Sequence, residues 1–531
     1  MKSAHCKPRW QILRPQALPL PLPLPLPLPL PLPLPLVLSC LLGLLGLFGL
    51  PSTATPKQAD EPRPPTALQR IPLSLQVDDA ALPDLQCQPP PRPAPPAAAA
   101  AAAAAGPQTE IPDAQEVETA LGTAQPAAEP SPPPAVGAPT TRLPLATDGA
   151  PYRIAVWGDS HMAAAFFTDE LARILAPTLG SSNNRFVHAG VGHGGVRGLV
   201  RKVCLSAGWT RETAHARPAA AEAPGPGLVS LLAQEPGTRV ALDLRDANGQ
   251  PRHRAVQILF GPTDQAATVA VSVNDGGETT VVLPGAAAPA GNVVGNVAIE
   301  LRTNAALSTL KLRLVQGALR WQGLRLGDAA PATGLQLDVL AYPGATALGW
   351  ARADPALLGA WFDAPAYDLV LLAYGTNEGN DPTYSAGTYR EMLVRAVGRM
   401  RQQFPQARCV LVGPGDRGIR VAKSRVKFRQ PAPKTAAARA AARRAAAAAA
   451  RVDLLKFSRI HEEINRIQQT VAAQLGCGAW DMQARMGGRG SAYKWARLSP
   501  ALMAPDLIHF TAAGYRELAQ RFAADAGWGG R

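Results

Sequence analysis

The chain has 531 residues, which is enough for two or three domains, and its formal net charge is +14. Such an excess of positive charge is common in nucleic-acid-binding proteins, but a good part of it lies in one tract, residues 417–451. Phe428 is the only aromatic residue of that tract, so it offers little for stacking on bases. We therefore expect no nucleic-acid partner. For an exported protein, the charge favours an anionic glycan or lipid headgroups instead.

Residues 1–54 have the features of a signal peptide or an N-terminal anchor. A basic start is followed by a Leu-Pro repeat over residues 18–36, whose alternating prolines exclude an α-helix, and by an apolar run over residues 37–50. That run is shorter than the roughly 20 residues of a membrane-spanning helix. The small residues that end at Ala54 favour cleavage there and export to the periplasm or cell envelope. The alternative is an uncleaved anchor, which would associate the protein with a membrane.

Residues 55–150 consist mainly of proline, alanine and scattered polar residues, including an alanine run at 97–105. With so few large apolar side chains, burial cannot offset the loss of chain entropy on folding. We expect a disordered tether.

The four cysteines after residue 54 show no Cys-x-x-Cys spacing, so they do not predict a zinc site. In an oxidising compartment, a disulfide between Cys204 and Cys477 or between Cys409 and Cys477 is possible. The spacing alone does not choose between bonded and free thiols.

The rest of the chain predicts an α/β domain interrupted by an all-β domain. Residues 151–216 read as its first part, with a buried strand at 154–157, a helix at 163–175 that ends before Pro177, and a second strand at 186–189. Residues 228–328 contain short alternating runs separated by Asn/Gly turns, which is typical of a β-sandwich. Residues 335–531 return to the α/β pattern.

In that second part, we expect helices at 348–358, 386–404, 454–475 and 512–523 and strands at 369–373 and 409–412. The alternation predicts a three-layer α/β/α fold with a parallel sheet, and the β-sandwich is inserted after its second strand. The alanine-rich, basic residues 417–451 form a further insertion, which we interpret as a solvated helix or a disordered loop.

Three short motifs carry the chemistry: Gly158-Asp159-Ser160-His161, Gly375-Thr376-Asn377-Glu378 and Asp506-Leu507-Ile508-His509. The first two follow apolar strands, and parallel sheets place ligands at the carboxyl ends of their strands. Ser160 is the candidate nucleophile, which requires a base to take its proton. We predict His509 as this base and Asp506, three residues earlier, as the carboxylate that orients it. The alternative is that Asp159 or Ser160 merely caps a helix.

These motifs resemble those of the SGNH, or GDSL, hydrolases, which have a flavodoxin-like three-layer α/β/α fold. The resemblance implies a catalytic Ser160, His509 and Asp506, and an oxyanion hole that includes Asn377 and a glycine. We prefer Gly344 for the glycine, after a strand-like run, with Gly190 or Gly192 as the rival.

The residues beside the nucleophile, Asp159 and His161, are expected to bind substrate. Should the Gly-rich loop at 190–195 instead provide the base, His188 or His193 would replace His509. The resemblance implies no metal ion and no organic cofactor.

A sandwich inserted ahead of the Gly344 block further resembles bacterial peptidoglycan O-acetylesterases, as do Asp481-Met-Gln-Ala-Arg-Met-Gly-Gly488 and Trp495. This resemblance spans residues 152–528 and implies an exported serine esterase that removes O-acetyl groups from a glycan, with peptidoglycan as the expected polymer. The Leu-Pro repeat, the tether and the basic insertion depart from it. Alternatives are a broader carbohydrate esterase or lipase, an O-acetyltransferase, or a non-catalytic glycan-binding envelope protein.

Overall fold

The computed structural model describes residues 68–77, 84–87, 109–123, 142–145, 150–216, 224–285, 295–327, 334–362, 367–422, 435–437, 439–440 and 452–528. The predicted signal peptide or anchor, residues 1–54, lies outside them. Within these ranges, no helix is long and apolar enough to cross a membrane.

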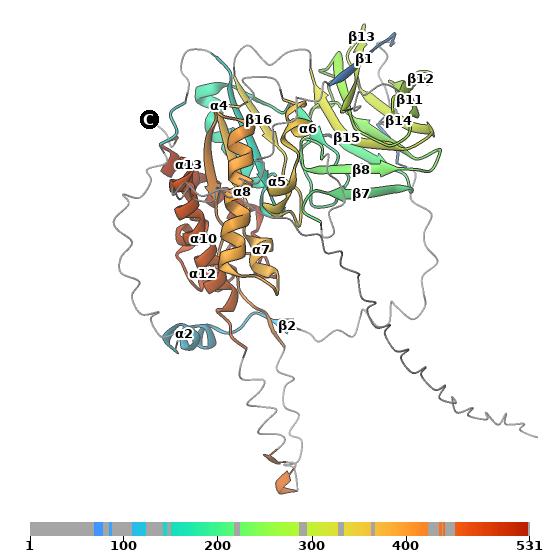
Figure 1. Cartoon of the computed structure of the whole chain (residues 1–531). Coiled ribbons are helices and arrows are strands. Elements are labelled where there is room, and N and C mark those ends of the chain that lie inside the picture. Colours follow the sequence, from blue (N-terminus) through green and yellow to red (C-terminus); the bar gives the residue numbers. More distant parts are fainter. Residues whose placement is uncertain are drawn as a thin grey trace, which may run out of the picture. The chain divides into compact units, whose positions relative to one another are not determined.

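A six-stranded sheet forms the centre of the α/β domain (Figure 1). Its order is β20-β18-β17-β3-β16-β4, and every neighbouring pair is parallel. The strands are β3 (Tyr152–Gly158), β4 (Ser182–Asn183), β16 (Leu335–Val339), β17 (Leu369–Ala373), β18 (Arg408–Val412) and β20 (Gly478–Trp480). Apart from the two-residue β4, the chain order across the sheet is 2-1-3-4-5, which is the flavodoxin-like arrangement. The predicted fold class is confirmed.

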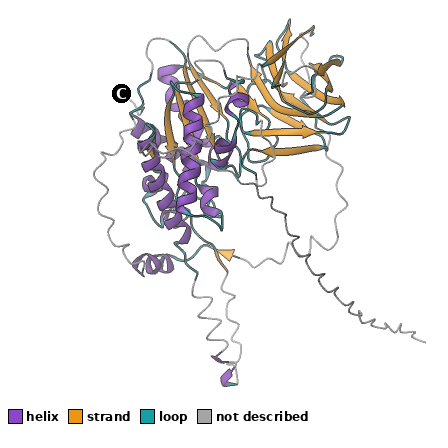
Figure 2. Ribbon diagram, in the orientation of Figure 1, coloured by secondary structure: helices purple, strands orange, loops and turns teal. Residues whose placement is uncertain are grey.

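Helices cover both faces of this sheet (Figure 2). Side chains alternate along β3, so Ile154 and Val156 pack on α4 (Phe166–Leu179) and α13 (Ala512–Ala526). Ala155 and Trp157 face the other layer, which contains α5 (Leu348–Arg352), α8 (Ala386–Gln403) and α10 (Lys456–Gln474). Shorter helices are α2 (Ala114–Thr123), α3 (Ser160–Ala163), α6 (Pro355–Gly359), α7 (Thr376–Asn380), α11 (Met482–Met486) and α12 (Ser491–Ala496).

Two sheets form the β-sandwich, and they enclose one apolar core. One has the order β1-β13-β10-β15-β8-β7 with β5 paired to β15, and the other has the order β12-β11-β14-β9-β6. The strands are β1 (Gln69–Leu75), β5 (Phe186–His188), β6 (Lys202–Leu205), β7 (Trp209–Thr213), β8 (Val229–Ala233), β9 (Arg239–Asp243), β10 (Ala255–Gly261), β11 (Ala267–Val273), β12 (Thr279–Leu283), β13 (Val297–Thr303), β14 (Thr309–Gln316) and β15 (Leu319–Leu326).

The predicted start of this insertion at residue 228 is too late. The strand expected at 186–189 is β5, which pairs antiparallel with β15 of the sandwich and not with the parallel sheet. β6 and β7 also belong to the sandwich, so only residues up to about β4 form the first part of the α/β domain. An apolar run of three or four residues fits either kind of sheet, which explains the error.

The predicted tether is partly folded. Ile71, Leu73 and Leu75 alternate along β1, which pairs parallel with β13 at the edge of the sandwich, where Pro72 is tolerated. Helix α2 adds Val117 to the core of the α/β domain. These short apolar patterns lie within long polar or proline-rich surroundings, and composition alone therefore did not reveal them.

Two disulfides are present in the described chain. Cys409–Cys477 joins the start of β18 to the residue before β20. This disulfide is one of the two predicted pairings, and it is confirmed. The other predicted pairing is wrong, because Cys204 bonds Cys87 and so ties the N-terminal segment to β6 of the sandwich.

Two helix predictions and one insertion boundary also change. The chain breaks at Ala165, which has φ 62°, so α3 and α4 are separate and Pro177 lies inside α4. The helix expected at 348–358 is the pair α5 and α6. The first residues of the basic tract are part of the fold, because β19 (Val421–Ala422) pairs with β2 (Thr109–Glu110). Residues 423–434 and 441–451 lie outside the described chain.

Candidate active site

Ser160 lies at the carboxyl end of β3, beside the carboxyl end of β17. The first and third strands of a 2-1-3-4-5 sheet meet here, and this switch point is where such sheets bind ligands. Asp159 provides the cap of α3, since its carboxylate accepts the N–H of His161 at 2.9 Å. Ser160 itself is therefore not the capping residue. Its Oγ lies 2.9 Å from Nε2 of His509.

His509 and Asp506 form the second half of this hydrogen-bonded chain. Nδ1 of His509 lies 2.7 Å from Oδ2 of Asp506, and the hydrogen bond raises the pKa of the imidazole above its usual value. Burial disfavours the charged Asp506 carboxylate. Nevertheless, hydrogen bonds from the His509 ring and from the backbone N–H groups of Ile508 and His509 hold its pKa well below the usual range. At neutral pH, Asp506 is therefore a carboxylate that orients the ring.

The segment that connects Asp506 to His509 is a non-helical turn. Leu507 within it is fully buried and has φ 59°, a backbone conformation that side chains other than glycine rarely adopt. Two hydrogen bonds fix the turn: the N–H of Gly418 donates to Leu507 O at 3.0 Å, and the N–H of Ala504 donates to His509 O at 2.8 Å. Such local strain is typical of functional sites.

Backbone and side-chain N–H groups lie around the same strand ends. Gly344 follows β16 with φ 81°, and a Cβ atom added there would meet nothing within 4 Å. Nδ2 of Asn377 donates to Ala345 O at 2.9 Å, and its second N–H is available for a ligand. The backbone N–H groups of Ser160 and Gly344 donate to no acceptor within the described ranges. The geometry thus offers two backbone donors and one amide.

Glu378 connects the Asn377 segment to the Gly344 segment. This role was not apparent from the sequence. Its carboxylate accepts the N–H of Gly375 at 3.0 Å and the N–H of Ala347 at 2.9 Å, so it ties the start of α7 to the segment after Gly344. Burial raises its pKa to about 7. The only available signal was its position directly after Asn377.

The rival residues make other contacts. The N–H of Gly190 donates to Nδ1 of His188 at 3.1 Å, and a Cβ atom at Gly192 would lie 2.9 Å from Leu205 of the sandwich. His188 is buried, and Nδ1 of His193 accepts the N–H of Gly195. Neither imidazole bonds Ser160, so the structure brings His509 and not the Gly-rich loop to the serine.

Asp159 and His161 were expected to bind substrate, and the structure corrects this, because both side chains are buried, with 2% and 4% exposure. Burial raises the pKa of Asp159 to about 6 and lowers the pKa of His161 to about 3. His161 is therefore a neutral ring that lies behind His509, with its ring centroid 5.5 Å away, and bonds the hydroxyl of Tyr515 at 3.2 Å. Both residues support the site from within.

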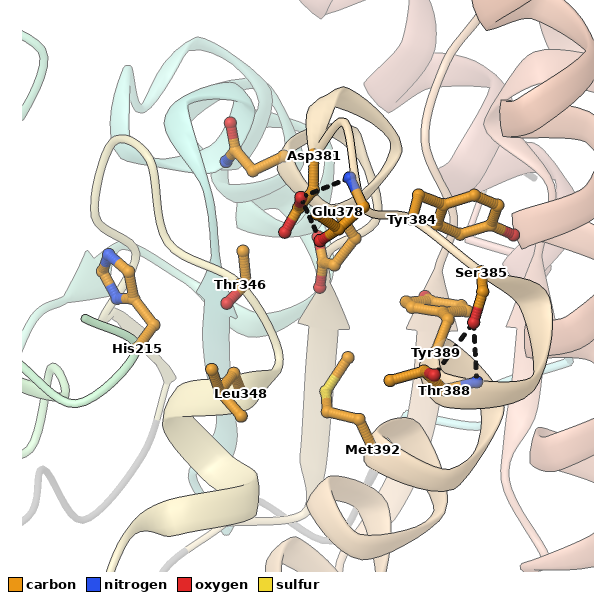
Figure 3. A pocket seen from close by; sticks show the side chains of 12 residues that line it. His215, Thr346, Leu348, Glu378, Asp381, Tyr384, Ser385, Thr388, Tyr389 and Met392 are labelled. Carbon is orange, nitrogen blue, oxygen red and sulfur yellow. Dashed lines mark hydrogen bonds between the residues drawn. The ribbon is translucent and has the colours of Figure 1, made fainter. Parts of the chain in front are cut away.

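A pocket of about 260 Å³ adjoins Asn377 (Figure 3). In that view, His215 lies on one side of the pocket, and Tyr384 and Ser385 lie on the other. Thr346, Leu348 and Met392 provide apolar surface, whereas the loop before α8 contributes hydroxyls. The pocket can hold a group of about the size of a sugar ring. Across the described chain, no group of three or more His, Cys, Asp or Glu side chains is arranged to hold a metal ion.

Comparisons with known proteins agree with this geometry. The sequence model of the GDSL-like lipase/acylhydrolase family matches residues 303–517, a stretch that contains every site residue named above from Gly344 to His509 but not Ser160. A search of curated proteins finds no match. A solved structure of a peptidoglycan O-acetylesterase is similar, with 21% identity and a TM-score of 0.50, covering 72% of this chain and 92% of that chain.

An active-site mutant of a family two carbohydrate esterase from Clostridium thermocellum is a weaker match, with 10% identity and a TM-score of 0.23, covering 56% of this chain and 95% of that chain. The family match, the flavodoxin-like sheet and the Ser160–His509–Asp506 hydrogen bonds lead to one assignment. Residues 303–517 match the GDSL-like lipase/acylhydrolase family of ester-bond hydrolases, and the fold of the chain resembles that of a peptidoglycan O-acetylesterase.

Proposed function

We propose that this protein is an exported serine esterase that removes O-acetyl groups from a glycan, with the 6-O-acetyl group of N-acetylmuramoyl residues in peptidoglycan as its substrate. The observation that carries the proposal is the hydrogen-bonded chain from Ser160 Oγ through His509 to Asp506, at 2.9 and 2.7 Å. It lies at the switch point of the sheet, beside N–H donors that have no acceptor among the residues that the structure describes.

In the first half of the reaction, Ser160 Oγ attacks the acetyl carbonyl carbon while Nε2 of His509 takes the hydroxyl proton. The Asp506 carboxylate stabilises the imidazolium that forms. Negative charge develops on the carbonyl oxygen, where the N–H groups of Ser160 and Gly344 and the Asn377 amide donate hydrogen bonds. The C–O bond to the sugar then breaks, and His509 returns the proton to the sugar oxygen.

In the second half, a water molecule attacks the acetyl-Ser160 ester, and His509 takes one of its protons. The same donors hold the second oxyanion. When the bond to Ser160 Oγ breaks, His509 returns the proton to Oγ, and acetate leaves with the hydroxyl group of the water. Both halves of the reaction use only acid–base and nucleophilic groups of the chain. We therefore expect the reaction to proceed without a metal ion or an organic cofactor.

Export is supported by the disulfides Cys87–Cys204 and Cys409–Cys477, because disulfides persist mainly in oxidising compartments such as the periplasm. The basic and apolar composition of residues 1–54 fits the same destination. The similarity in fold to a peptidoglycan O-acetylesterase favours a cell-wall polymer over a lipid as substrate.

Acetate release tests this proposal. Purified protein that begins at residue 55 is incubated with O-acetylated peptidoglycan and with the same material after mild base has removed its esters. We expect acetate from the first material only, and none from the Ser160→Ala variant. Hydrolysis of p-nitrophenyl acetate without any release from the polymer would show an esterase with another substrate.

A further inference from the structure

Arg417 lies beside the Ser160–His509–Asp506 site, although its sequence context is the basic tract. It follows β18 in the loop at residues 413–418, so it lies at the same edge of the sheet as the carboxyl ends of β3 and β17. The neighbouring Gly418 donates its N–H to Leu507 O, the residue after Asp506, at 3.0 Å. This hydrogen bond fixes the Arg417 backbone against the turn that holds the Asp506 carboxylate.

The guanidinium of Arg417 is held on an aromatic ring. Its Cζ lies 3.8 Å from the ring centroid of Phe457, near the start of α10, and both side chains are half-buried. This stacking fixes where the guanidinium lies, and partial burial strengthens its electrostatic interaction with a bound anion.

Two nitrogens of this guanidinium lack protein partners. Nε and Nη1 of Arg417 are buried, and nothing in the described ranges accepts a hydrogen bond from either. A charged donor left in this state is costly, and a hydrogen-bonding anion would remove the cost. Burial lowers the pKa of Arg417, and an arginine side chain remains a cation at neutral pH.

The charge of Asp506 acts on Arg417, but the Asp506 carboxylate has other hydrogen-bond partners. Oδ1 accepts the N–H groups of Ile508 and His509, and Oδ2 bonds the His509 ring. Arg417 influences Asp506 and His509 only through charge, at longer range. The guanidinium is therefore a cation near Asp506 and His509 that is not used in orienting His509.

We propose that Arg417 binds a carboxylate of the substrate that lies close to the acetyl ester being hydrolysed. This inference rests on the proposed function and specifies it: the preferred substrate is an acidic acetylated sugar, not a neutral one. Nε and Nη1 lie on different edges of the guanidinium, so each can donate to a carboxylate only singly or together with Nη2, and such a charged hydrogen bond adds affinity and fixes orientation. In a muramoyl unit, the carboxylate comes either from the lactyl group on the sugar or from the peptide attached to it.

Small substrates separate these sources. The first is 6-O-acetyl-N-acetylmuramic acid with a free lactyl carboxylate, and the second is its methyl ester, which is neutral. The third is the 6-O-acetylated muramoyl dipeptide, whose lactyl group is an amide and whose carboxylate lies on the peptide. For each, kcat/KM is divided by the value for p-nitrophenyl acetate measured with the same enzyme preparation, so that a change in the reactivity of Ser160 cancels.

For the unaltered protein, we expect this ratio to be roughly tenfold to a hundredfold higher for the acidic substrate than for the methyl ester, as charged hydrogen bonds allow. In Arg417→Gln, the preference should disappear through a higher KM, and in Arg417→Lys it should return in part. The dipeptide should follow the acidic sugar if the peptide carboxylate is bound, and the methyl ester if the lactyl carboxylate is bound.

Lys456 provides the matched control, because its Nζ lies over the same Phe457 ring, at 5.4 Å. Lys456→Gln removes an equal charge close by and should keep the preference for the acidic sugar. If Lys456→Gln and Arg417→Gln lose the preference for the acidic sugar equally, general attraction between positive charge on the protein and the anionic substrate explains the effect. The proposed site at Arg417 is then overturned. An unaltered protein whose ratio is no higher for the acidic sugar or for the dipeptide than for the methyl ester overturns it too. If no acetylated sugar is hydrolysed while p-nitrophenyl acetate is, the proposed function itself fails.

Discussion

Oγ of Ser160 lies 2.9 Å from Nε2 of His509, although 349 positions separate the two residues along the chain. Most of the β-sandwich and most of the second half of the α/β domain lie between them. The contact exists because β3 is central in the parallel sheet, while the turn before α13 folds back over its carboxyl end. The sandwich is accommodated as an insertion that leaves this edge of the sheet intact.

Replacing the nucleophile should separate activity from folding. Ser160→Ala should abolish hydrolysis of p-nitrophenyl acetate, since no other described hydroxyl bonds His509 Nε2. The helix cap comes from Asp159 and remains, so the melting temperature should change by no more than a few degrees. Ser181→Ala, at an exposed position, is the control. Turnover by Ser160→Ala at the level of this control would exclude Ser160 from the mechanism.

Removing the amide donor tests the oxyanion hole. Asn377→Ala should lower kcat by about 10²–10³-fold with little change in KM, because this hydrogen bond strengthens only as charge develops on the carbonyl oxygen. Asn248→Ala, in an exposed turn of the sandwich, should have no effect. Steady-state kinetics on p-nitrophenyl acetate measure both. An Asn377→Ala enzyme with normal kcat would mean that the backbone donors alone hold the oxyanion.

The elements that could be predicted from the sequence are those with long, regular patterns. The strands at 154–157, 369–373 and 409–412 are uninterrupted apolar runs, and the helices α8, α10 and α13 have clear amphipathic spacing. The pairing partner of β5 could not be predicted, because three residues carry no information about which sheet they join. Strand β1 was missed since its alternation lies within a polar, proline-rich region.

Among the site residues, those that act through conspicuous chemistry were predictable, and those that act through packing were not. Ser160, Asp506 and His509 are brought together as expected. Arg417 was counted with a solvated tract, because nothing in the sequence shows that its neighbour Gly418 bonds Leu507. The burial of His161 was equally hidden, as it depends on packing against Tyr515, more than 350 positions away.

The disulfide Cys409–Cys477 should stabilise the sheet substantially. It closes a loop of 68 residues, and the entropy lost by the unfolded chain corresponds to about 4 kcal/mol in the loop-closure treatment, with measured values often lower. Cys409→Ser with Cys477→Ser should therefore lower the free energy of unfolding by roughly 2–4 kcal/mol in urea titrations. Reduction of the unaltered protein also breaks Cys87–Cys204, so it should lower the free energy of unfolding by at least as much. An unchanged midpoint would show that the bond contributes nothing.

The basic insertion should be dispensable for stability. Residues 431–450 consist mainly of alanine and arginine and, apart from Pro431 and Pro433, offer no apolar side chain larger than alanine to bury. Deleting them, with β19 left in place to pair with β2, should change the melting temperature by only a few degrees. A deletion variant that fails to fold would show that these residues pack against the domain. Retained stability with altered hydrolysis of the polymer alone would instead indicate a role in access to the site.

The pH dependence should follow the protonation of His509. Only the neutral imidazole can accept the proton of Ser160, so kcat/KM should rise as pH increases through the pKa of His509. The Asp506 carboxylate raises that pKa, so the rise should lie above the usual range of a histidine in the unaltered enzyme. In Asp506→Asn, the charge and its hydrogen bond are lost, and the midpoint should move to lower pH.

Turnover should fall in the same variant, because an amide at position 506 neither stabilises the imidazolium nor holds the correct tautomer, an effect of about 10⁴ in the best-studied triad. KM should change little. His509→Ala should be at least as damaging, and the double variant should be hardly worse than the worse single one, since the two residues act as a unit. Glu517→Gln, which removes a surface carboxylate paired with Arg521, is the control and should keep both the rate and the midpoint. Normal turnover in Asp506→Asn, with its midpoint unmoved, would assign the orienting role to another group.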